Sequence, residues 1–159
     1  MRYLKYNEEF TGITDPNLIK LVDDLKSFAN DSLAYLIDDG FSISVGRKSY
    51  NPSILHNINY SSYIKGYLPE FSILKRKGEV DEYNTAKVEK FTWEEIKDDF
   101  IPFIEMCNEK YLFMNVAIFN TFGFHQVQID DLINDNLNPT LLKDIVGIRF
   151  YIQGYKIRK

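Results

Sequence analysis

The stretch that most constrains the fold is residues 91–119, where a helix with a well-marked start runs directly into an apolar strand. Thr92 is a suitable N-cap, and Glu95 completes a capping box, in which each side chain accepts a hydrogen bond from the other residue's backbone N–H. Phe91 and Ile96 occupy the two positions of a hydrophobic staple around this cap. Together these signals predict a helix that begins directly after Thr92.

This helix carries one apolar stripe that continues past an internal proline. Pro102 removes the hydrogen bond to the carbonyl of Asp98, so we expect a kink there, not an end. The following residues, 112–119, are apolar on both faces and predict a central strand. The stripe consists of Ile96, Phe100, Phe103, Ile104, Cys107 and Tyr111.

A second helix–strand unit precedes the first along the chain. Asp15 and Pro16 supply an N-cap and a favourable first helical residue, and Gly40 supplies the left-handed position that ends a helix. We therefore predict a helix over 16–39. Residues 41–45 alternate between apolar and polar side chains and predict a strand with one buried face.

These units predict an α+β fold in a single domain, residues 1–159: a two-layer sandwich with two long helices on one face of a five- or six-stranded, mostly antiparallel sheet. If the first predicted strand forms, the order begins β-α-β-β-α-β, as in ferredoxin-like folds. The other predicted strands are residues 2–7, 70–77, 124–129 and 145–157.

The two helix–strand units align with each other at an offset of 71 residues. Leu25 and Leu33 then fall on Ile96 and Ile104, and Phe41 falls on Leu112. Gene duplication is one explanation, and the general similarity of any two amphipathic helix–strand units is the other.

Composition limits the classes of function. A net charge of −4 disfavours a general nucleic-acid or membrane binder. A single cysteine excludes an intrachain disulfide and a multi-cysteine zinc site. The first residues lack the apolar run of a signal peptide, and no apolar run approaches the ~18 residues of a membrane span. We therefore expect a soluble, cytoplasmic protein.

Motifs for catalysis and metal binding are missing from the sequence. Cys107 falls on an apolar helix stripe, which indicates a buried, inert thiol. His56 and His125 have no paired spacing that would indicate a metal site. We predict no enzymatic activity, no catalytic residues, no metal and no cofactor. Four acidic doublets are interpreted as solvated surface: Asp23-Asp24, Asp38-Asp39, Asp98-Asp99 and Asp130-Asp131.

The best candidate for a working surface is the long connection over residues 48–69. Its Tyr, Ser and Asn content is typical of binding loops, in which Tyr gives a large contact area with few rotatable bonds. A loop that packs its tyrosines on its own domain is the alternative. The predicted partner-binding residues are Tyr50, Tyr60, Tyr63 and Tyr67.

An alternative function is a nucleic-acid-binding α+β module. The two predicted helices are acidic, so the strands and loops carry a net positive charge. Basic residues on the sheet side, with tyrosines to stack on bases, would suit this function, although charged residues also protect sheet edges from aggregation. The basic residues concerned are Lys75, Arg76, Lys77 and Arg149.

The closing strand, residues 145–157, predicts self-association. Because it is terminal, we expect it at a sheet edge, where unpaired N–H and C=O groups are available to another chain. Its outward residues Arg149, Tyr151 and Gln153 are compatible with cross-strand pairing. We predict a homodimer or a higher closed assembly formed partly through this strand.

Three segments carry a resemblance to a known group of proteins. They are Leu-Ile-Asp-Asp-Gly-Phe at 36–41, Phe-Thr-Trp-Glu-Glu-Ile-Lys-Asp-Asp at 91–99 and Val-Gly-Ile-Arg-Phe at 146–150. Over roughly residues 18–152 the chain resembles small uncharacterised proteins of tailed-bacteriophage genomes. The resemblance implies a virion component, an assembly factor or a small effector that binds a host protein, in the host cytoplasm or the virion. The leading hypothesis is a non-enzymatic protein-interaction module.

Overall fold

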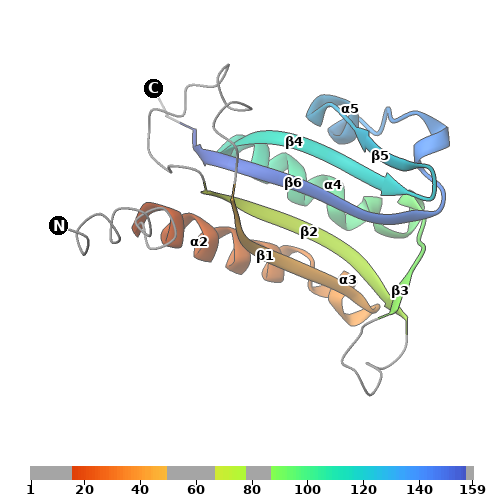
Figure 1. Ribbon diagram of the computed structural model, residues 1–159, viewed down its shortest axis with the longest axis horizontal. Helices are drawn as coiled ribbons and strands as arrows, with labels where there is room; N and C mark the ends of the chain where they lie inside the picture. The colour runs from red at the N-terminus through yellow and green to blue at the C-terminus, as the bar shows by residue number, and fades with distance from the viewer. Residues whose placement is uncertain (1–15, 50–66, 78–86, 157–159) are drawn as a thin grey trace, which may run out of the picture.

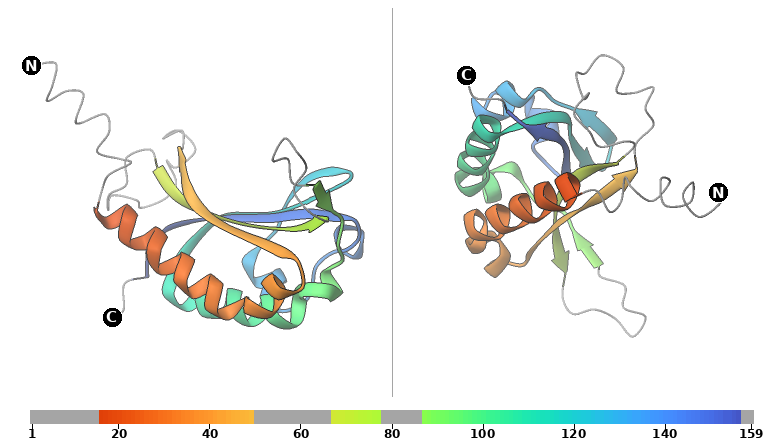
Figure 2. Two further views of the ribbon diagram at one scale, coloured as in Figure 1. Left: turned by 90° about the horizontal axis from the view of Figure 1, so that it is seen from below. Right: turned by 90° about the vertical axis from the view of Figure 1, so that its left-hand side faces the viewer.

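The computed structural model describes residues 16–49, 67–77 and 87–156, which form two layers (Figure 1). Both long helices, α2 (Pro16–Ser32) and α4 (Trp93–Lys110), lie on the same side of the sheet (Figure 2). The predicted α+β fold is confirmed. The remaining elements are α3 (Ala34–Asp38), β1 (Phe41–Ser49), β2 (Tyr67–Lys77), β3 (Lys87–Glu89), β4 (Tyr111–Asn120), β5 (Gly123–Gln126), α5 (Ile129–Ile133), a 3₁₀ turn (Pro139–Leu141) and β6 (Ile145–Tyr155).

Helix α4 begins as its local signals predict. The backbone N–H of Thr92 donates to the carboxylate of Glu95 at 2.7 Å, as a capping box requires. Pro102 lies inside the helix, which continues for a further two turns to Lys110. The short-range signals around residue 92 are therefore sufficient to place this element.

The predicted helix over 16–39 is interrupted once, at Leu33. The backbone there opens to a φ of −111°, but the N–H of Leu33 still donates to the carbonyl of Ala29 at 2.9 Å. Gly40, at a φ of +97°, ends the segment in the left-handed conformation that glycine adopts without a steric penalty.

The strands form one sheet in the order β1-β2-β6-β4-β5, with β3 paired to β2, and each of these pairs is antiparallel. Strand β2 begins at Tyr67, three residues before the predicted strand. Strand β5 ends at Gln126, because residues 129–133 form α5 instead of extending the strand. The predicted strand over residues 2–7 lies outside the described residues.

The prediction that the closing strand lies at a sheet edge is wrong. Strand β6 pairs with β2 on one side and with β4 on the other. Within the described part of the sheet, β1 and β5 are the edge strands. The physical reason is burial: Ile148, Phe150 and Ile152 are at most 1% exposed, and a strand this apolar is stabilised most in the middle of the core.

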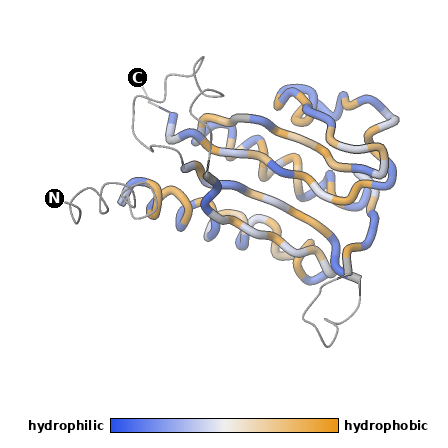
Figure 3. Tube along the Cα trace, viewed as in Figure 1, coloured by the Kyte–Doolittle hydropathy of each residue, from blue (hydrophilic) through white to orange (hydrophobic). Residues whose placement is uncertain are grey.

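The core fills the space between the helices and the sheet. At its centre the rings of Phe71 and Phe150 stack with centroids 4.6 Å apart, and Phe103 of α4 packs on Phe71 at 5.3 Å. Hydrophobic and hydrophilic positions alternate along both long helices, so each helix turns an apolar stripe toward the sheet (Figure 3). One continuous core therefore joins both helix–strand units.

The two units hold equivalent places in this sheet. Helix α2 packs on β1 and β2, α4 packs on β4, and the inner strands β2 and β6 meet antiparallel in the middle. Phe71 faces Phe150 across that seam. The arrangement has an approximate two-fold axis between these two rings.

The hydrogen-bond register agrees with the repeat in the sequence. Phe41 of β1 faces Lys75, while Leu112, 71 residues after Phe41, faces Gly154. The step from Lys75 to Gly154 is 79 residues, the same step that separates Phe71 from Phe150. The register, which is independent of side-chain similarity, supports the duplication hypothesis.

Candidate functional site

The sheet face turned away from α2 and α4 carries the candidate site; we call it the open face. Side chains alternate between the two faces along a strand. In β2, Phe71 and Ile73 point into the core, so Glu70, Ser72 and Leu74 belong to the open face.

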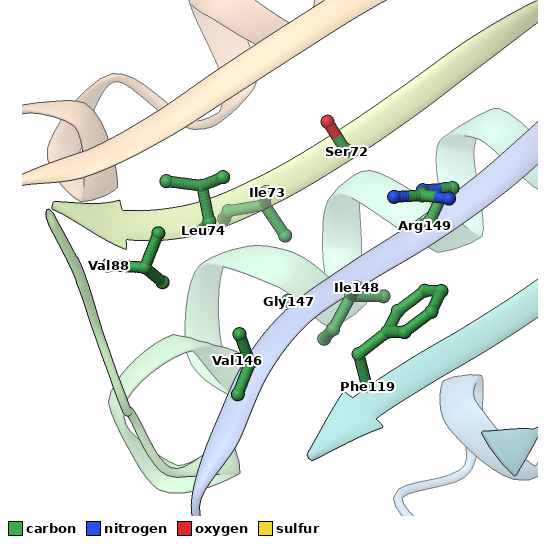
Figure 4. A pocket seen from close by; sticks show the side chains of 9 residues that line it. All are labelled: Ser72, Ile73, Leu74, Val88, Phe119, Val146, Gly147, Ile148 and Arg149. Atoms are coloured by element: carbon green, nitrogen blue, oxygen red, sulfur yellow. The ribbon is translucent and has the colours of Figure 1, made fainter. Parts of the chain in front are cut away.

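A cavity of about 220 Å³ lies on the open face between β2, β3, β4 and β6 (Figure 4). Val88, Leu74 and Val146 lie toward one end, Ser72, Arg149 and Phe119 lie toward the other, and α4 is behind the sheet. A Cβ atom added to Gly147 would stand 3.2 Å from the carbonyl oxygen of Ile73, so a side chain at this position would crowd the seam between β2 and β6. The walls are mostly apolar, and Arg149 is the charged residue among those that line the cavity.

Arg149 contacts Phe119 and Glu70 and also shares a side-chain hydrogen bond with Tyr151. Its guanidinium carbon lies 4.8 Å from the ring centroid of Phe119, a cation–π contact. Its Nε lies 3.7 Å from Oε2 of Glu70, which is not among the residues that line the cavity. The side chain of Arg149 is 41% exposed and that of Glu70 is 21% exposed, so the cation is the more accessible partner.

Tyr151 faces Glu70 across the β2–β6 ladder and completes the polar cluster. Burial raises the pKa of Tyr151 to about 12, and a hydrogen bond to the Glu70 carboxylate acts in the same direction. Tyr151 therefore stays a neutral phenol at physiological pH. Arg149 and Tyr151 are thus both neighbours of the Glu70 carboxylate.

Exposed apolar side chains surround the cavity on neighbouring strands. Val88 of β3 is exposed at one end. Beyond the other end, Phe119 of β4 packs edge-to-face with Phe124 of β5 at 5.2 Å, and Phe124 and Phe122 are exposed. This apolar rim extends across the open face from β3 to the β4–β5 hairpin.

The predicted tyrosine surface is only partly described. Tyr50, Tyr60 and Tyr63 lie outside the described residues. Tyr67 is the first residue of β2, is half-buried and packs on the core, so the strand begins before the predicted connection ends.

The four basic residues of the alternative function do not form one patch. Lys75 points toward α4, where its Nζ lies 2.8 Å from Oε1 of Glu95, and this hydrogen bond raises the pKa of Lys75. Arg149 lies on the opposite face beside Glu70. Arg76 is exposed, and Lys77 ends β2.

The three residues predicted for self-association lie inside the sheet. Arg149 and Tyr151 are each paired with both β2 and β4, and Gln153 is buried. Sequence reasoning thus identified two residues of the polar cluster, but for the wrong reason. It missed Glu70 and Phe119, whose positions opposite β6 depend on the strand order.

Cys107 and His125, the other candidate residues that the structure describes, lie outside the cavity. Cys107 is buried, as predicted, and burial raises the pKa of its thiol to about 12. His125 contacts Asn120, Nε2 to Oδ1, at 2.9 Å. Among the described residues, no group of three or more His, Cys, Asp or Glu side chains is arranged to hold a metal ion. None of the described helices is long and apolar enough to cross a membrane.

The fold and the site together define a small α+β domain with helices on one sheet face and a cavity on the other. Comparison of the chain with known protein families, with curated proteins and with solved structures gives no match.

Proposed function

We propose that this chain is a non-enzymatic protein-interaction module that binds a partner protein through the open face. The observation that carries the proposal is the apolar rim at both ends of the cavity, from Val88 to Phe124, with Arg149 among the lining residues. Protein interfaces are enriched in aromatic residues and arginine at their cores. Exposed contiguous apolar surface on a soluble domain typically marks an interaction site.

The resemblance to proteins of tailed-bacteriophage genomes gives the proposal a context. A virion or assembly component would find its partner among the other proteins of the particle. A small effector would find its partner in the host. In either case the partner would be a protein, and an extract of infected cells would contain it.

Photo-crosslinking tests which face binds. A photoreactive phenylalanine replaces Phe124 on the open face or, as a matched control, Met106 on α4; the two native side chains are 57% and 53% exposed. Both proteins are irradiated in extract from infected and uninfected cells. We expect a discrete adduct from position 124, competed by unlabelled parent protein, and no such adduct from position 106.

Two further variants sharpen the result. Unlabelled protein carrying Val88→Ser and Phe124→Ser should fail to compete, because it lacks two exposed apolar contacts of the rim. Adducts of equal yield from both positions, or competition as strong as that of the parent, would contradict an open-face interface. A competitor with Tyr60→Ala and Tyr63→Ala tests whether the 48–69 connection contributes; we expect it to compete less well than the parent.

A further inference from the structure

The volume of the cavity limits the size of the group that it can bind. Its volume of about 220 Å³ is below the ~300–1,000 Å³ of pockets that enclose drug-sized ligands. Its walls are provided largely by Leu74, Val88, Val146 and the ring of Phe119. One branched or aromatic side chain is the matching occupant, because a larger group would extend past the walls into solvent.

The positive charge of Arg149 favours an occupant that also carries an anionic group. Arg149 contributes the cationic group of the lining, while the Glu70 carboxylate is not among the lining residues and contacts Arg149 and Tyr151. A guanidinium has five N–H donors and binds a carboxylate with two parallel hydrogen bonds. The contacts with Phe119 and Glu70 restrict the guanidinium before binding, which lowers the entropic cost of binding.

The apolar walls and Arg149 border the same small space, so the apolar group and the anion of the occupant must be neighbours (Figure 4). The last residue of a polypeptide meets this condition, because its side chain and its free carboxylate are attached to one Cα atom. An internal apolar residue has no carboxylate on its own Cα atom. An Asp or Glu side chain brings an anion without an apolar group.

We infer that the open-face cavity binds the C-terminal residue of the partner protein, with an apolar side chain inside the cavity and the terminal carboxylate on Arg149. This inference rests on the proposed function and names the part of the partner that is recognised. It assigns Arg149 as the residue that distinguishes a free C-terminus from an internal segment.

The first experiment uses probes that mimic a C-terminal residue. The full chain, labelled with ¹⁵N, is titrated with N-acetyl-phenylalanine and N-acetyl-leucine as free acids, and with the corresponding carboxamides. We expect backbone amide shifts centred on Ser72, Gly147 and Arg149. The carboxamides should bind about 10- to 100-fold more weakly, the range for loss of a hydrogen bond to a charged group.

The second experiment removes the arginine without leaving a lone buried charge. The paired variant Arg149→Met with Glu70→Gln replaces both members of the ion pair, since removing one partner alone is the more destabilising change. We expect it to fold and to bind acid and carboxamide equally. The control Lys26→Gln, an exposed site on α2 across the sheet, should keep the parent's preference for the acid.

The outcomes separate this inference from the proposed function. The assignment of a C-terminal residue is overturned if the parent binds acid and carboxamide equally, or if the acids cause no amide shifts at millimolar concentration. The crosslinked adduct from position 124 tests the proposed function separately. A third probe, 3-phenylpropanoate, lacks the acetamido group of a peptide. If it binds as tightly as N-acetyl-phenylalanine, the cavity is specific for small carboxylic acids and the peptide assignment fails.

Discussion

Truncation of either ring at the centre of the core is the most direct test of the architecture. Phe150 is fully buried and its ring lies 4.6 Å from Phe71, 4.8 Å from Phe113 and 6.4 Å from Phe103. Phe→Ala at such a site costs about 3–5 kcal/mol. For a chain of this length, this loss lowers the melting temperature by roughly 6–20 °C. We expect Phe71→Ala to have an equal cost, because the two rings occupy equivalent positions about the two-fold axis.

A double-mutant cycle measures whether the two rings stabilise each other. Stacked rings contribute about 0.5–1.5 kcal/mol beyond their buried area, so the double variant should lose less than the two single losses together. The assay is urea unfolding followed by far-UV circular dichroism, with the slope of the free energy against urea used to check that each variant unfolds in one transition. Phe122→Ala on the exposed hairpin is the control and should change stability by less than about 0.5 kcal/mol.

Two results would refute this account of the core. A loss below about 1 kcal/mol for Phe150→Ala would mean that the β2–β6 seam is not the packed centre of the domain. A loss for Phe71→Ala that differs from it by several kcal/mol would mean that the two halves are not equivalent in their packing.

Three further predictions concern Glu95, Tyr151 and nucleic-acid binding. A hydrogen bond from Lys75 holds the pKa of Glu95 below its usual value. The stability that this contact contributes is therefore present above about pH 4.5 and is lost as the pH falls through the lowered pKa of Glu95. The unfolding free energies of the parent and Glu95→Gln should converge once the pH is below this lowered pKa. Tyr151→Pro should prevent folding, as seen by circular dichroism, since Tyr151 is paired on both sides. A variant that folds normally but has a smaller mass than the parent in size exclusion with light scattering would contradict this placement of β6. Fluorescence anisotropy with single-stranded DNA and RNA should show no binding that weakens steeply with salt; such binding would favour the nucleic-acid alternative.

The sequence predicted the elements whose signals are local. The start of α4 depends on Thr92 and Glu95, three residues apart, and the end of the first helical segment depends on Gly40 alone. Both were placed correctly because the residues that determine them are neighbours in the chain. The fold class followed, since two amphipathic helices and several alternating strands have few ways to bury their apolar faces.

Strand order and the cavity were not predictable in the same way. The terminal position of β6 says nothing about its neighbours, which are set by burial of Phe150 against residues far away in sequence. The cavity depends on that order, because Leu74, Phe119 and Gly147 come from three strands that meet only in the folded sheet. Gly147 was the available signal: a glycine inside an apolar strand often marks a bulge or a close approach of two backbones.

Because the two halves meet at the seam between β2 and β6, the domain is comparable to a dimer whose two subunits are covalently linked. Each half, a helix followed by strands, leaves one apolar strand edge and one large ring without cover until the other half arrives, as in the interface of an obligate homodimer. Substitutions at Phe71 or Phe150 therefore act as changes in the association of two subunits whose effective concentration is fixed by the covalent connection. Separately produced halves should accordingly associate in solution, through this seam together with contacts between the halves such as Phe28 with Phe103 and Lys75 with Glu95.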